Sequence, residues 1–161
     1  MKKQFILLGL ASGLLYAACQ SGSTSSETKK DTLEITEGSN QEIPYQLASN
    51  YFIKNTVKDP IPNRIDNQEE FDNYFGMATT MGKNGTPTPI DFSKQYIIVI
   101  DYKETADKTD LEVVNLENKG DELVLTYQVI VGEQTSFKTH PFLLVIVDKN
   151  ITGEVVLQQE L

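Results

Sequence analysis

The chain has little of several residue types on which common protein chemistries depend. Its 161 residues include one cysteine, one histidine, one arginine and no tryptophan. A single cysteine excludes an intramolecular disulfide, and together with one histidine it supplies too few ligands for an ordinary zinc site. The formal net charge of −9 argues against nucleic acid as a partner, because phosphate contacts need clustered lysine and arginine. Without tryptophan, an aromatic sugar-binding cleft of the glycosidase type is not expected.

The first residues have the pattern of a secretory signal. Two lysines, Lys2 and Lys3, precede an apolar run from Phe5 to Tyr16, which is too short for a membrane span. The small residues Ala17 and Ala18 follow, and then the only cysteine, Cys19. This order resembles the lipobox of bacterial lipoproteins.

The lipobox resemblance implies that residues 1–18 are removed and that the thiol of Cys19 carries a diacylglycerol. The third position before the cysteine usually holds leucine in that family, and here it holds Tyr16. The alternative is an ordinary signal peptide cut after Ala18, which would leave an exposed free thiol of the kind that secreted chains avoid. Gln20, rather than aspartate, follows the cysteine, as in lipoproteins sorted to the outer membrane. We therefore expect a lipid-anchored protein of the bacterial cell envelope, at the outer membrane, on its periplasmic or surface face.

The segment after the cysteine is predicted to be a stalk. Residues 19–31 are rich in serine and threonine and have no large apolar side chain, so they cannot bury enough surface to become ordered. The sequence Asp31–Leu33 looks like the short O-glycosylation signal of secreted Bacteroidetes proteins, which would modify Thr32. The remaining residues, 32–161, are enough for a single domain. Its acidic surface would not adsorb to anionic headgroups, so the lipid alone would hold the protein at the membrane.

Residues 32–161 carry the apolar patterns of a β-rich domain. The continuous apolar run Tyr96–Ile100 is typical of a strand that is covered on both faces. Two alternating segments, Leu111–Leu116 and Glu122–Val131, flank a turn at Asn118–Asp121 and predict a hairpin. Further strands are expected at Tyr51–Val57, Phe142–Val147 and Gly153–Leu157, with an irregular arm or edge strand between Thr32 and Ala48.

One short helix is predicted before Gly76. Asp66 or Asn67 can cap it, with the spacing to the glutamates that follow expected of a capping box. Aromatic residues at positions 71, 74 and 75 would then form one stripe that faces a core. The predicted fold class is mainly β (α+β): a small antiparallel β-sandwich or open barrel with one short helix.

Three short motifs resemble the C-terminal domain of the protease-complex subunit PrcB. They are Glu69–Phe71, Ile90–Ser93 just before a buried strand, and Thr139–Phe142 before the last core strand. The similarity covers residues from about Asn50 to Lys149, although Glu104–Asp110 stands where that family often has a Thr-Gly-Gly-aromatic turn. The resemblance implies a non-enzymatic extracytoplasmic domain that binds or supports another protein.

A catalytic site is not expected. His140 is the only histidine, so a nucleophile–base pair would need Ser93 or Ser136 beside it. Neither serine lies in a Gly-x-Ser-x-Gly frame, and the neighbours of His140 predict an exposed turn. We therefore predict a protein that is not an enzyme and that has no cofactor.

Carboxylates crowd the connection that follows the strand Tyr96–Ile100. In a loop they could offer oxygen ligands to Ca²⁺, although a solvated charged loop, partly neutralised by Lys103 and Lys108, is the plainer interpretation. Asp101, Glu104, Asp107 and Asp110 are thus candidate contacts to a partner or to calcium, with Glu112 close by.

The leading prediction is a lipid-anchored binding or assembly module with a protein partner. Two predicted loops, Gly76–Pro89 and Lys103–Asp110, and exposed strand edges would make the contacts. Met77 and Met81 in the first loop would either adapt to a partner or cover the helix. The alternatives are a protease inhibitor that presents loops from a β-sandwich, and a carrier of Ca²⁺ or another small ligand.

Overall fold

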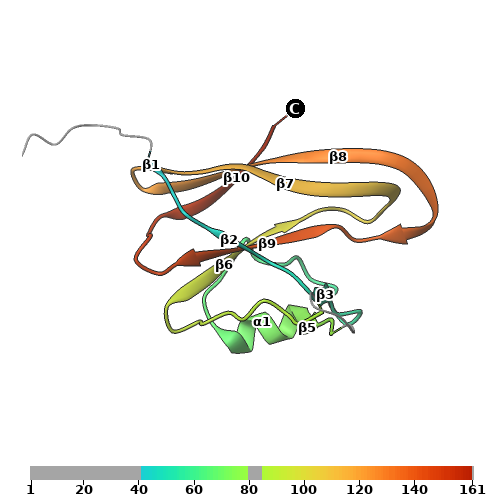
Figure 1. The fold of residues 1–161 in the computed structure, drawn as a ribbon, viewed down its shortest axis with the longest axis horizontal. Coiled ribbons are helices and arrows are strands. Elements are labelled where there is room, and N and C mark those ends of the chain that lie inside the picture. The colour runs from blue at the N-terminus through green and yellow to red at the C-terminus, as the bar shows by residue number, and fades with distance from the viewer. Residues whose placement is uncertain (1–40, 80–84, 161) are drawn as a thin grey trace, which may run out of the picture. The chain divides into compact units, whose positions relative to one another are not determined.

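Strands dominate the structure, as the sequence predicts. The chain divides into two units, Met1–Ile35 and Thr36–Leu161, and the computed structural model describes residues 41–79 and 85–160, all in the second unit. These residues contain ten strands and one helix (Figure 1). The mainly β prediction is confirmed, and because the sheets do not close into a barrel, the arrangement is that of a small β-sandwich.

The first sheet contains the predicted hairpin. Its strand order is β1-β7-β8-β10, in which β7 (Thr105–Lys119) and β8 (Glu122–Thr139) pair in antiparallel fashion. Gly120 in the connecting turn has a φ of 78°, the positive value for which glycine is suited. β1 (Gln41–Glu42) pairs antiparallel with β7. β10 (Glu154–Glu160) pairs with β8 in parallel, contrary to the all-antiparallel expectation, because the chain first crosses the other sheet and returns in the direction of β8.

The second sheet is antiparallel throughout. Its order is β2-β9-β6-β4, with the predicted apolar strands β9 (Phe142–Asp148) and β6 (Gln95–Asp101) at the centre. β2 (Gln46–Ala48) and β4 (Arg64–Ile65) are its edges. The expected arm between Thr32 and Ala48 is therefore a pair of short edge strands, one in each sheet, from residue 41 onward. Its first part, residues 32–40, lies outside the described residues.

β6 and β9 supply side chains to two separate cores, which confirms that Tyr96–Ile100 is covered on both faces. Alternate residues of β6 point to opposite sides of the sheet. One cluster lies between the two sheets and the other lies between the second sheet and the helical layer. The first contains Ile43, Tyr96, Ile98, Ile100, Leu116, Leu123, Leu125, Val145 and Val147. The second contains Ile61, Ile65, Phe71, Phe75, Ile97, Val99, Leu144 and Ile146.

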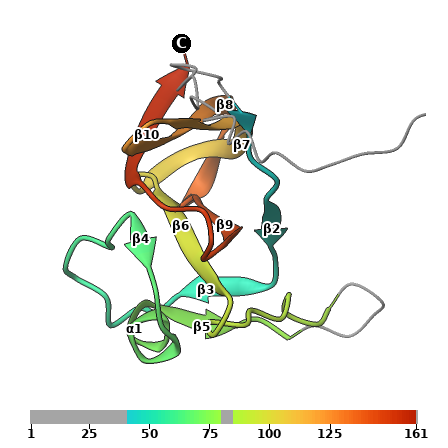
Figure 2. The same ribbon diagram turned by 90° about the vertical axis from the view of Figure 1, so that its left-hand side faces the viewer.

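A helix and a two-stranded ribbon form the layer below the second sheet (Figure 2). α1 (Gln68–Tyr74) begins at Asn67, whose side chain accepts a hydrogen bond from the Glu70 N–H at 2.8 Å, which confirms the predicted cap. The helix ends at Tyr74, before the predicted stop, because the chain continues directly into β5 (Phe75–Met77).

β5 pairs with β3 (Tyr51–Ile53), which is shorter than the predicted strand. The Lys54 N–H donates to the Tyr74 carbonyl, and the Val57 N–H donates back to the Lys54 carbonyl, so the chain turns after Ile53. Gly76, which the sequence places at the helix end, instead lies in β5 opposite Phe52, and the Phe52 ring lies over its Cα.

Candidate protein-interaction surface

The hairpin of β7 and β8 is much longer than the strands that flank it. β1 pairs with β7 only at Glu117 and Asn118, and one further bond joins the Ile43 N–H to the Leu116 carbonyl. Pro44 follows, and it has no N–H with which to continue the ladder. On the other side, β10 pairs with β8 only from Glu122 to Gln128. Among the described strands, the far half of the hairpin therefore has no third strand on either edge.

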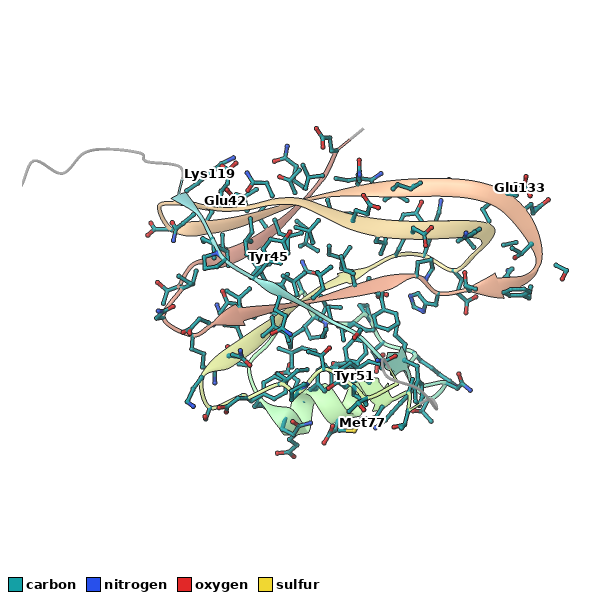
Figure 3. All side chains as sticks on the ribbon, viewed as in Figure 1. Glu42, Tyr45, Tyr51, Met77, Lys119 and Glu133 are labelled. Atoms are coloured by element: carbon teal, nitrogen blue, oxygen red, sulfur yellow. The ribbon has the colours of Figure 1, made fainter. Side chains whose placement is uncertain are left out.

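We call this far half, Thr105–Asn115 of β7 and Val129–Thr139 of β8, the distal ribbon. Lys119 and Glu133 mark the two ends of the hairpin in Figure 3, with the turn at one end and the distal ribbon at the other. Figure 1 shows that the ribbon bends at this far end, where β8 leads into β9.

The distal ribbon exposes large apolar side chains. The face formed by Leu123, Leu125 and Tyr127 is buried over the first core, as predicted, but the alternation continues past the edge of that core. Val131 is 58% exposed, and Ile130 on the opposite face is 43% exposed. Large apolar side chains that a ribbon leaves exposed are candidates for contact with another protein.

A wide bulge in β8 presents a third apolar side chain. Thr105 pairs with Thr139 and Asp107 pairs with Gln134. Between these two pairs β8 has more residues than β7, and the extra residues form the bulge. Phe137 lies in this bulged segment and is 63% exposed. The Thr135 hydroxyl lies 2.8 Å from the Ala106 carbonyl and holds the segment to β7.

A concavity of about 380 Å³ adjoins the bulge. Aliphatic and aromatic carbon atoms make up most of its surface, which suits an apolar side chain of a partner. It is lined by Lys108, Thr109, Thr135, Phe137, Thr139 and Pro141.

The predicted acidic loop is largely strand. β7 begins at Thr105, so the expectation of a loop over Lys103–Asp110 is wrong for most of its length. Backbone pairing to β8 outweighs the low strand propensity of the charged residues, because context decides strand formation more than composition does. Asp110 and Glu112 are exposed and lie opposite Ile130 and Gln128 of β8.

The candidate carboxylates have separate surroundings. Glu104 is exposed just before β7, and Asp107 accepts a hydrogen bond from the Thr105 hydroxyl. Glu112 accepts a hydrogen bond of 2.9 Å from the Gln128 amide. Within the described residues, no three histidine, cysteine or acidic side chains form a group that could hold a metal ion. The calcium interpretation therefore stays a prediction.

The structure brings together one pair that the sequence did not connect. Asp101 ends β6 and His140 precedes β9, and His140 Nε2 lies 2.6 Å from Asp101 Oδ1. His140 is thus half-buried, in place of the exposed turn that we predicted. No local sequence pattern indicates this pair, because Asp101 and His140 are brought together by the long-range pairing of Asp101 with Phe142.

The two candidate serines have other positions. The Ser93 hydroxyl donates a hydrogen bond of 2.5 Å to Asp91, and this bond with the one from the Ser93 N–H lowers the pKa of the Asp91 carboxyl. Ser93 therefore belongs to a turn before β6. Ser136 is exposed in the bulge of β8.

Arg64 has a structural position that sequence reasoning missed. Its guanidinium makes a two-pronged contact with Asp66, and the hydrogen bond to that carboxylate raises the pKa of Arg64. The same group lies 3.9 Å from the centre of the Tyr96 ring and 3.4 Å from the Gly153 carbonyl. Arg64 thus joins β4 to β6 and to the connection that precedes β10.

The described part of the loop Gly76–Pro89 is fastened to the β2–β3 connection. The Thr88 N–H donates to the Ser49 carbonyl, and the Tyr51 hydroxyl donates to the Thr88 carbonyl at 2.7 Å. Met77 ends β5 and is 65% exposed. Met81 lies outside the described residues, as do Cys19 and Thr32.

Comparisons with known proteins give no relative: no protein family, no curated protein and no solved structure matches this chain. The resemblances to bacterial lipoproteins and to the PrcB C-terminal domain therefore remain predictions. In the described part of the chain, no helix has the length and apolar character needed to cross a membrane.

Proposed function

We propose that this protein is a lipid-anchored extracytoplasmic binding or assembly module, without catalytic activity, that contacts a protein partner through the distal ribbon. The lipobox-like sequence around Cys19 supports the anchor, and the PrcB-like motifs support a partner-binding role. The lipobox-like sequence, with Gln20 after the cysteine, also supports a location at the bacterial outer membrane.

The observation that carries the proposal is the combination of open strand edges with exposed apolar side chains. A soluble protein usually protects long strand edges, because they pair readily with other chains. Here both edges of the distal ribbon lack a third strand among the described residues, and Ile130, Val131 and Phe137 are exposed beside them. Strand addition with apolar anchors in adjacent hollows is a common mode of protein recognition.

Site-specific photo-cross-linking in intact cells tests the proposal. A photoreactive phenylalanine analogue replaces Phe137 in the full-length chain, and a second strain carries it at Asp121 in the hairpin turn. We expect a defined protein adduct from position 137 and none from position 121, since both positions are exposed but only the first lies on the distal ribbon. Adducts from position 121 alone would contradict the proposed surface.

The second candidate function is protease inhibition. The bulged segment Gln134–Thr139 favours it, because Phe137 is displayed on a segment that Thr135 holds to β7. This function predicts that the purified protein slows an extracytoplasmic protease and that Phe137→Ala removes the effect. If each protease of a panel cleaves its peptide substrate at the same rate with and without the protein, protease inhibition is excluded.

A further inference from the structure

We infer that the outer edge of β7 from Thr109 to Val113 binds an extended segment of the partner in which cationic side chains alternate with β-branched apolar ones. This inference deepens the proposed function and rests on it.

The stretch Thr109–Val113 is the regular part of the open edge. Its pairing with β8 runs without interruption from Thr109 opposite Val131 to Val113 opposite Tyr127, and register shifts occur on both sides of it. Along β7, the first backbone hydrogen bond from the neighbouring segment is that of the Ile43 N–H, just after β1, to the Leu116 carbonyl. Bulges prevent regular pairing at the two ends, so a strand of a few residues fits this stretch and a long one does not.

The two faces of this stretch differ in chemistry. Asp110 and Glu112 are exposed on one face, and Leu111 and Val113 pack against the first core on the other. A strand added beside β7 would place successive side chains next to each face in turn. Cations would then lie beside the two carboxylates, and β-branched apolar side chains would extend the core beside Leu111 and Val113.

The charge of this edge disfavours pairing of two β7 edges in the register that brings their carboxylates together. Antiparallel pairing of two β7 edges would set Asp110 and Glu112 of one copy beside those of the other, and like charges directly opposite are destabilising. The opposite edge of the distal ribbon has no such bias, because Glu133 and Lys138 offset one another. The two carboxylates therefore favour a cationic segment over this pairing of two β7 edges.

Peptide binding to the full-length protein in detergent tests the inference. The probe is a labelled peptide with blocked ends in which lysine and valine alternate over about seven residues, the length of an ordinary strand. We expect it to bind and to slow hydrogen exchange of the amides of Thr109–Val113. A glutamate–valine peptide of the same length should not bind. The lysine–valine peptide with an N-methyl group on every residue should bind at least about tenfold more weakly, since none of its amides can donate to the β7 edge.

Two charge-reversed variants separate the edge from the overall charge. The double variant Asp110→Lys with Glu112→Lys should bind the lysine–valine peptide about tenfold more weakly, and it should bind the glutamate–valine peptide. Asp121→Lys with Glu122→Lys makes the same change of charge at the hairpin turn and should leave binding unchanged. Equal losses in both variants, undiminished binding of the N-methylated peptide, or exchange protection elsewhere would overturn the inference.

The cross-linking experiment at Phe137 makes the two levels of the argument distinguishable. A partner adduct from position 137 together with failure of the lysine–valine peptide overturns the edge inference and leaves the proposed function standing. If position 137 gives no adduct, but the lysine–valine peptide binds and slows hydrogen exchange at Thr109–Val113, the proposed partner contact through the bulge is overturned. The same result supports binding at the outer edge of β7.

Discussion

At the residue scale, Tyr96 has a fully buried aromatic ring and a hydroxyl that makes no hydrogen bond within the described residues. A buried polar group without a partner costs free energy in the folded state. The aromatic ring, by contrast, makes a cation–π contact, because the guanidinium of Arg64 lies over it.

Tyr96→Phe should therefore leave the free energy of unfolding unchanged or raise it by up to about 1 kcal/mol. Tyr96→Leu, which removes the ring below Arg64, should lower it by about 2 kcal/mol or more. Urea denaturation followed by circular dichroism measures both. A loss of more than about 1 kcal/mol in Tyr96→Phe would show that the hydroxyl has a partner after all.

The same residue predicts how stability changes in alkali. Burial raises the pKa of Tyr96 above its usual value near 10, with a smaller contribution from Asp66 and an opposing one from Arg64. The folded state therefore keeps this proton in a pH range where the unfolded state has lost it, so the contribution of Tyr96 to stability is constant below about pH 10 and falls as the pH rises further. Tyr96→Phe should show a shallower fall than the wild type, and identical alkaline denaturation curves would contradict this.

Gly153 is the residue whose backbone most restricts substitution. Its φ is 146°, and a Cβ built on it would lie 3.1 Å from the Leu123 N and 3.3 Å from the Asp121 carbonyl oxygen. Both neighbours are main-chain atoms of the hairpin, which cannot move aside as a side chain would.

Gly153→Ala should lower the free energy of unfolding by about 1–3 kcal/mol. Gly132→Ala is the matched control, because its nearest contact would be 3.4 Å and its φ is ordinary. Thermal melts of the two variants compare them directly. A control that melts as low as Gly153→Ala would show that the effect is not due to the backbone of residue 153.

At the scale of elements, α1 is a short helix that depends on its cap and on the core beneath it. An isolated helix of this length is unstable in water, so packing and capping must supply its stability. Phe71 supplies the packing, since it is buried and stacks on Phe75 with ring centres 4.9 Å apart.

Asn67→Ala removes the hydrogen bond to the Glu70 N–H and should cost about 1 kcal/mol of unfolding free energy. Asn73→Ala, an exposed position in the same helix, should cost nothing measurable, because alanine is the better helix former. Chemical denaturation of both variants is the measurement. Equal costs would mean that the cap contributes nothing beyond helix propensity.

The sheet elements show how far pattern alone reaches. The apolar periodicity of β6, β9 and the first part of β8 was sufficient to predict these strands, because alternating or continuous apolar residues can be buried in only a few ways. It did not predict that β8 continues past Val131 to Thr139. It was insufficient for the start of β7, where charged residues join the sheet through backbone pairing alone. The parallel pairing of β10 also lay beyond the pattern, since it follows from the path of the chain between sheets.

At the scale of the whole molecule, the lipid anchor would set where the protein acts. Cys19→Ser removes the only thiol, so the processed chain should move from the membrane pellet to the soluble fraction. The melting temperature of the β-rich unit should not change, because the substitution alters none of the residues in its two core clusters. Fractionation and mass spectrometry of the N-terminal peptide are the measurements, and an unmodified Cys19 in the wild-type peptide would contradict lipidation at this residue.

The sequence by itself determined the buried strands β6 and β9, the helix cap and the hairpin turn, because each depends on neighbours along the chain. Only the tertiary structure decided which distant residues meet: Asp101 with His140, and Arg64 with Gly153. Within the part of the chain that the structure describes, it also left the distal ribbon without a third strand, since β1 departs at Pro44 and β10 ends its pairing at Gln128. The physical reason is that periodicity fixes which face of a strand is apolar, whereas the cover on an edge depends on how other segments pack around it.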